Sequence, residues 1–161
     1  MTHSLDNNTA IKLKFLARVI RKESQHLLGT DQRLFKMPFT IDRARQLESD
    51  LELSERVEAF VGRFGRLQDT VGDKLLPVIL VALGEIPAAN IDNLDKAERL
   101  GLLGSADDWL AMRQLRNQMV HEYVEDMSVL ASALQTGHTF VPALIEAVNK
   151  LLAEIDRRGW A

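Results

Sequence analysis

The sequence predicts an all-α protein, an up-and-down bundle with four principal helices and short extra helices. Almost every apolar stretch repeats at intervals of three and four residues, which is the helical period. Glycine and proline are scarce, with 9 and 4 residues, so few positions interrupt a helix. A chain of 161 residues is long enough for one domain with a substantial core. We therefore expect a single helical domain over residues 1–161.

Composition narrows the class further. Hydrophobic residues make up 46% and charged residues 27% of the chain, as in globular proteins. The absence of cysteine excludes disulfides and thiolate metal sites. The first residues lack a signal-peptide pattern, and the most apolar run, residues 75–83, is too short to span a bilayer, so we expect a cytoplasmic protein without a membrane partner. A net charge of -3 disfavours a general nucleic-acid coat but permits a local basic pocket.

The first half of the chain predicts three helices. An apolar stripe at helical spacing begins the first, which Gly29 would end; it holds Ile11, Phe15, Leu16, Val19 and Ile20. After a loop over residues 29–39, Thr40 would cap a short helix. Ser54 would cap the third and longest helix, which Gly84 and Pro87 would end.

The long helix changes character beyond Asp73. Residues 78–81 are apolar on all sides, which requires burial in the core or in a subunit interface. Pro77 removes one backbone hydrogen bond and should bend the helix near Asp73.

The second half predicts three further segments. Asn93 would cap a short helix stopped by Gly101, and Ser105 with Asp108 forms a capping box for the next helix. Residues 124–134 continue that helix or restart it, and Gly137 ends it. His138 would lie in the following turn, and Thr139 would cap the last helix, which tolerates Pro142 in its first turn.

Residues 116–123 combine groups that suit metal-free RNA cleavage. RNA supplies its own nucleophile, the ribose 2′-hydroxyl, so a protein needs a base, an acid and a fixed positive charge. His121 titrates near neutral pH and suits acid–base work. Arg116 offers a permanently charged, planar fork to phosphate oxygens, and Asn117 can orient phosphate or sugar by hydrogen bonding.

The same segment resembles the signature of HEPN-domain ribonucleases, through Arg116, Asn117, His121 and Tyr123. The resemblance is closest to the HEPN toxins that pair with small nucleotidyltransferases. The resemblance implies a homodimer that cuts RNA in a cleft at the subunit interface, without a metal or another cofactor. It also implies that a nucleotidyltransferase antitoxin transfers AMP to Tyr123. A bulky anion there would lie beside Arg116 and block phosphate binding. The alternative for Tyr123 is a core ring with a hydrogen-bonded hydroxyl.

Helical geometry places Arg116 and His121 on different sides of a regular helix. At about 100° per residue, His121 would point about 140° away from Arg116 on an unbroken helix. Either the helix deforms between Asn117 and Val120, or two copies of the chain pool their residues across a dimer axis. The apolar surface around residues 78–81 could bury such an interface.

Other arginines could extend the pocket toward RNA. Arg113 lies three residues before Arg116, and Arg63 and Arg66 have the same spacing in the long helix. If the two helices pack together, the four would form a positive patch. Alternatively, Arg66, Asp69 and Asp73 form a solvated face of ion pairs.

Three functional classes follow. The first is the endoribonuclease toxin. The second is a binding module that holds a nucleotide or a nucleotidyltransferase partner and cuts nothing. The third is a structural bundle in which the motif is accidental.

Overall fold

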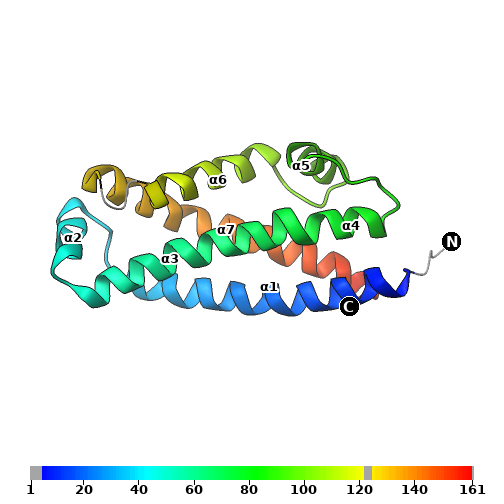
Figure 1. The fold of residues 1–161 in the computed structure, drawn as a ribbon, viewed down its shortest axis with the longest axis horizontal. Coiled ribbons are helices and arrows are strands. Elements are labelled where there is room, and N and C mark those ends of the chain that lie inside the picture. Colours follow the sequence, from blue (N-terminus) through cyan, green and yellow to red (C-terminus); the bar gives the residue numbers. More distant parts are fainter. Residues whose placement is uncertain (1–4, 122–124, 161) are drawn as a thin grey trace.

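The computed structural model of the protein describes residues 5–121 and 125–160, most of them helical. Four long rods alternate in direction (Figure 1): α1 (Asn7–Leu34), α3 (Leu51–Asp69) continued by α4 (Leu76–Ala82), α6 (Ala106–His121) and α7 (Met127–Arg157). The short helices α2 (Ile41–Arg45) and α5 (Asn90–Arg99) lie at opposite ends of the bundle. The predicted all-α bundle is confirmed. Within the described ranges, no helix combines the length and apolar character needed to cross a membrane.

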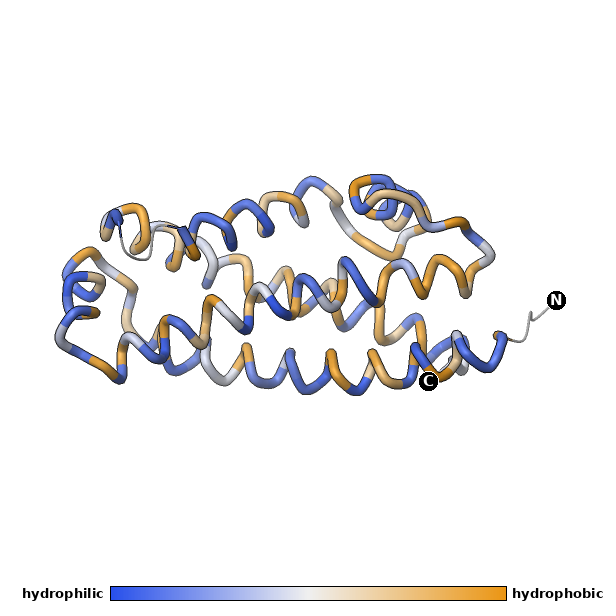
Figure 2. The backbone as a smooth tube through the Cα atoms, in the orientation of Figure 1, coloured by the Kyte–Doolittle hydropathy of each residue, from blue (hydrophilic) through white to orange (hydrophobic). Residues whose placement is uncertain are grey.

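One apolar core joins the rods. Hydropathy alternates along each rod in Figure 2, as expected for helices that bury one face and expose the other. In α1 the fully buried positions Leu13, Ala17, Ile20 and Leu27 follow the helical period. Each large side chain buried in this way contributes about 1.5–3 kcal/mol relative to an exposed one, so this periodicity holds the bundle together.

Several expected helix boundaries are confirmed. The Thr40 hydroxyl accepts a hydrogen bond from the Arg43 N–H at 3.3 Å and caps α2. The Ser105 hydroxyl accepts from the Asp108 N–H at 3.1 Å at the start of α6. Gly101 has a φ of 75° and follows the end of α5, a conformation that favours glycine.

Three boundaries differ from expectation. Helix α1 runs through Gly29 to Leu34, because a single glycine costs a helix only about 1 kcal/mol, which the buried face of α1 outweighs. Helix α3 begins earlier than Ser54, where Asp50 accepts from the Leu53 N–H at 3.0 Å. Asn93 lies inside α5 and bonds both backbone polar groups of Ala88, at 2.8 and 3.1 Å.

The expected break at residue 137 is also wrong, because α7 is continuous from Met127 to Arg157. A Cβ on Gly137 would lie 3.3 Å from both the Met119 sulfur and a Phe60 ring carbon. The glycine therefore makes room for neighbouring side chains instead of ending the helix. His138 and Thr139 accordingly lie within α7, and Pro142 lies in its interior rather than in a first turn.

The expected irregularity near Asp73 is a π-helical turn over Thr70–Leu75, between α3 and α4. Here the Leu76 N–H donates to the Val71 carbonyl, five residues back. Pro77 follows directly and has no N–H to donate. Beyond the turn, the side chains of Ile79 and Leu80 are fully buried in the protomer's own core, whereas Val81 is 46% exposed.

Candidate functional site

Helix α6 carries, at its C-terminal end, the residues that the sequence analysis predicts for RNA cleavage. Trp109, Met112, Leu115 and Met119 form its buried face. The helix remains α-helical from Ala106 through His121. The helix is therefore not deformed between Asn117 and Val120, which excludes one of the two expected geometries. Tyr123 lies outside the described residues.

Arg116 is seated on α3, the neighbouring rod. Its Nη1 donates to the Asp69 Oδ1 at 2.9 Å, and both side chains are about one-third exposed, at 31% and 36%. The arginine side chain crosses directly over Gly65, where an added Cβ would lie 2.6 Å from the Arg116 Nε. Gly65 is therefore the position that lets the guanidinium reach Asp69.

The ion pair belongs to a longer ladder between α6 and the rod that α3 and α4 form. Arg113 donates through Nη2 to both Asp73 oxygens, at 2.9 and 3.0 Å, and its Nη2 lies 4.0 Å from the Asp69 Oδ1. Asn90 of α5 donates to the Asp73 Oδ1 at 2.9 Å. Each α6 arginine thus faces a carboxylate of the rod that α3 and α4 form, and the local charge is largely balanced.

Within the ladder, Arg116 keeps donors for another acceptor. A guanidinium has five N–H donors, and the hydrogen bond to Asp69 uses one of them. Among the described residues no other side chain or carbonyl accepts from Arg116. A phosphate oxygen could therefore bind the same guanidinium without displacing Asp69.

His121 and Asn117 face solvent on another side of α6. Both are exposed, and neither has a hydrogen-bond partner among the described residues. By helical geometry the two are about 40° apart, whereas His121 is about 140° from Arg116. One protomer therefore places histidine with asparagine but does not bring histidine and arginine together.

The expected patch of four arginines does not form. Arg63 points toward α1, where it donates to the His26 carbonyl at 3.3 Å and to the Thr30 hydroxyl. Arg66 is exposed, and its charge acts on Glu23 of α1. The reason is rotational: residues 65, 69 and 72 of this rod face α6, whereas residues 63 and 70 face α1.

The acidic partners also differ from the alternative interpretation of this segment. Asp69 and Asp73 were expected beside Arg66, but their partners are the two arginines of α6. A signal for this was in the sequence. Two acids four apart in one helix match two arginines three apart in another, a complementary pattern for adjacent rods.

A second polar contact, between His138 and Asp31, has no such indication in the sequence. His138 Nδ1 lies 2.7 Å from the Asp31 Oδ1, joining α7 to α1. Its ring stacks on Phe35, with centroids 4.3 Å apart and planes at 17°. Asp31 is only 7% exposed. The two residues are 107 positions apart in sequence, so no local pattern indicates the pair.

No group of three or more histidine, aspartate and glutamate side chains is arranged to hold a metal ion in the portion that the structure describes. Comparisons with protein-family models, with curated proteins and with solved structures return no match.

Proposed function

We propose that the protein is a metal-independent endoribonuclease of the HEPN type, acting in the cytoplasm as the toxin of a toxin–antitoxin pair. The observation that carries the proposal is the end of α6. The exposed Asn117 directly follows Arg116, and the exposed His121 lies five residues after it; the Arg116 guanidinium is positioned by Asp69 yet retains unused donors.

The chemistry follows from these groups. A neutral imidazole of His121 removes the proton from the ribose 2′-hydroxyl, whose oxygen attacks the adjacent phosphorus. Arg116 stabilises the added negative charge on the phosphorane, and Asn117 orients the phosphate or sugar. The bond from phosphorus to the 5′-oxygen then breaks, and a protonated imidazole gives that oxygen a proton. The products are a 2′,3′-cyclic phosphate and a free 5′-hydroxyl.

A homodimer is part of the proposal, because His121 and Arg116 diverge on the straight α6. In a two-fold arrangement, the histidine of one copy approaches the arginine of the other. The outer face of α6 suits contact with a second copy. Besides His121 and Asn117 it presents Ala111, Gln114 and Gln118, all exposed and uncharged. Residues 78–81 offer less surface than expected, since two of the four are fully buried within the protomer.

The test is incubation of purified protein with mixed cellular RNA in excess EDTA. We expect cleavage that leaves cyclic phosphate ends. His121→Ala should abolish cleavage while helical content and dimerisation stay unchanged, because the side chain is exposed. His26→Ala is the matched control, since His26 is an exposed histidine on α1. Cleavage by the His121→Ala variant at the wild-type rate would remove the mechanism.

Regulation by AMP transfer to Tyr123 from a nucleotidyltransferase antitoxin belongs to the same proposal. A phosphodiester two residues after His121 would add a negative charge beside the site and compete for the guanidinium. Co-expression with the nucleotidyltransferase should add the mass of one AMP and remove RNA cleavage. A Tyr123→Phe variant that is silenced equally well by the partner would contradict this control.

A second candidate is a binding module that holds a nucleotide or nucleotidyltransferase without turnover. The pairing of Arg116 and Arg113 with Asp69 and Asp73 favours it, because an arginine whose charge is balanced stabilises the extra negative charge of a phosphorane less, whereas its unused donors still bind a ground-state phosphate. EDTA-resistant cleavage distinguishes the two functions. If protein verified by mass spectrometry to lack AMP cuts nothing but binds a nucleotide, the module is the better description.

A further inference from the structure

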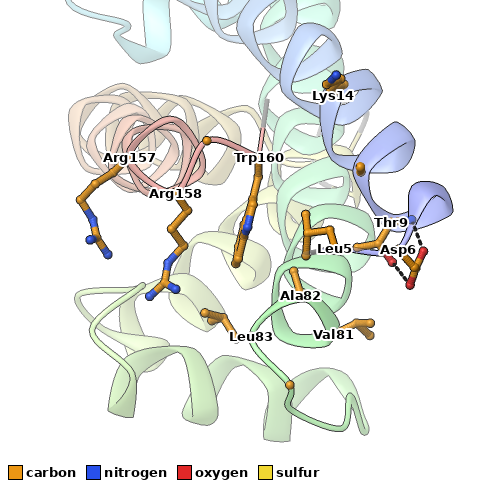
Figure 3. A pocket seen from close by; sticks show the side chains of 13 residues that line it. Leu5, Asp6, Thr9, Lys14, Val81, Ala82, Leu83, Arg157, Arg158 and Trp160 are labelled. Atoms are coloured by element: carbon orange, nitrogen blue, oxygen red, sulfur yellow. Dashed lines mark hydrogen bonds between the residues drawn. The ribbon is translucent and has the colours of Figure 1, made fainter. Parts of the chain in front are cut away.

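A cavity lies far from the α6 motif, at the end of the bundle where α1 begins and where α4 and α7 end (Figures 1 and 3). Its volume is about 1130 Å³. Aliphatic side chains, including Leu5 and Leu83, and the basic residues Lys14, Arg157 and Arg158 line it. In Figure 3 the indole of Trp160 lies between Arg158 on one side and Leu5 on the other.

Two glycine turns fix the walls. Gly159 has a φ of 68°, and the following Trp160 N–H donates to the Ile155 carbonyl at 3.0 Å. Gly84 has a φ of 82°, and the following Glu85 N–H donates to the Leu80 carbonyl at 2.8 Å. Both are six-to-one hydrogen bonds that close a helix C-terminus and direct the next residue. The cavity is therefore built from ordered helix ends.

The arginines at the cavity keep an excess of positive charge. Arg157 and Arg158 share a single carboxylate, Glu154, with contacts of 2.6 Å to each. Arg158 uses its Nε for that contact, and its guanidinium carbon lies 5.2 Å from the Trp160 ring centre. Among the described residues nothing accepts from the two terminal nitrogens of Arg158. Lys14 likewise has no hydrogen-bond or ion-pair partner within those ranges.

We propose that this cavity binds a nucleoside phosphate, either as a free nucleotide or as the phosphorylated end of an RNA strand. The indole and the adjacent aliphatic side chains offer a base a flat apolar surface. The terminal nitrogens of Arg158, with Arg157, offer a phosphate paired, charge-assisted donors. The mixture of charged and apolar walls suits this chemistry better than an acyl chain, which would need an apolar lining throughout. The site is separate from His121 and does not rest on the ribonuclease proposal.

The experiment is titration calorimetry of the full chain with AMP, adenosine, inorganic phosphate and a 5′-phosphorylated 2′-O-methyl oligonucleotide, which lacks the nucleophilic hydroxyl. AMP should bind saturably and more tightly than adenosine or phosphate alone. If the oligonucleotide binds more tightly than AMP, the ligand is an RNA end; if more weakly, it is a free nucleotide. Tryptophan fluorescence gives a second readout, because Trp109 is 2% exposed and a change on binding would come from Trp160.

An Arg157→Gln/Arg158→Gln double variant should bind AMP roughly tenfold more weakly or worse. Arg21→Gln is the matched control, since Arg21 is an exposed arginine paired with Asp156 of the same helix end but does not line the cavity. If circular dichroism shows that the double variant is misfolded, the single variant Arg158→Gln takes its place, with loss of affinity again expected.

Four results would overturn the proposal. They are no saturable binding of AMP or oligonucleotide, equal affinity for adenosine and AMP, an equal loss of affinity in Arg21→Gln, or loss of AMP binding in His121→Ala. Unchanged cavity binding in His121→Ala would separate this site from the motif whatever the outcome of the cleavage assay.

Discussion

Under the proposed ribonuclease function, Gly65→Ala should lower RNA cleavage with little change in stability. An added Cβ would lie 2.6 Å from the Arg116 Nε, whereas ordinary contact begins at 3.4 Å, so the arginine must move by about 0.8 Å. That movement pulls the guanidinium off Asp69. Misplacing a catalytic group by about 1 Å can cost roughly a hundredfold in rate. We therefore expect RNA cleavage to fall by roughly tenfold to a hundredfold.

Stability should change little in the same variant. Alanine in place of glycine stabilises a helix interior by about 1 kcal/mol. Weakening the Arg116–Asp69 ion pair, which is one-third exposed, costs up to about 1 kcal/mol. The two effects nearly cancel. The midpoint of thermal unfolding should therefore stay close to that of the wild type.

Gly62→Ala is the matched control, three residues earlier in α3. It is exposed, and nothing lies within 4 Å of its added Cβ. This variant should gain about 1 kcal/mol, or about 3 °C in melting temperature, with cleavage unchanged. If Gly65→Ala is stabilised as much as Gly62→Ala and cuts RNA at the full rate, the Arg116 guanidinium is not required on Asp69.

Three further variants test the packing. His138→Ala should lower the free energy of unfolding by about 2 kcal/mol in urea titrations, because it leaves the buried Asp31 carboxylate without its partner. Gln68→Met should raise that free energy by about 1 kcal/mol, since the Gln68 amide is 3% exposed and has no hydrogen-bond partner among the described residues. Burial raises the pKa of the Glu23 carboxyl above its ordinary 4.5, so Glu23→Gln should be stabilising at neutral pH.

The pH dependence of the Glu23 variant has a definite sign. A raised pKa in the folded protein means that stability is fully present below the unfolded value near 4.5 and is lost as pH rises through the folded pKa. The advantage of glutamine should therefore shrink below pH 4.5 and grow above it. An advantage that is constant with pH would contradict the assignment. The other two variants have contrary results of their own. They are a lower free energy of unfolding in Gln68→Met and an unchanged free energy of unfolding in His138→Ala.

The sequence predicted the class of fold because helical periodicity is a local property. It predicted boundaries only where the signal was also local, as at Thr40, Ser105 and Gly101. Gly29 and Gly137 failed because burial outweighs the small helical cost of glycine. At Gly137 the deciding contacts come from Met119 and Phe60, and no pattern in the neighbouring sequence indicates these contacts.

The motif on α6 was likewise visible in sequence, but its partners were not. The angle between Arg116 and His121 followed from helical geometry. The position of the Arg116 side chain, over Gly65 and bonded to Asp69, instead depends on how α3 is rotated relative to α6. The same rotation sends Arg63 to α1 and prevents the four-arginine patch. Which face of a rod meets which neighbour is a tertiary property, and sequence spacing alone leaves it open.

The π-helical turn at Thr70–Leu75 contains one residue more than an ordinary α-helical turn. Elsewhere in a helix, deleting a residue rotates everything downstream by about 100° and turns its apolar face outward. Here a deletion could be absorbed by tightening the wide turn to an ordinary α-turn, leaving α4 in register with the core. The turn separates Asp69, which seats Arg116, from the buried residues of α4. This segment is therefore where the rod could change length during evolution while the Arg116–Asp69 pair on one side and the buried face of α4 on the other are preserved.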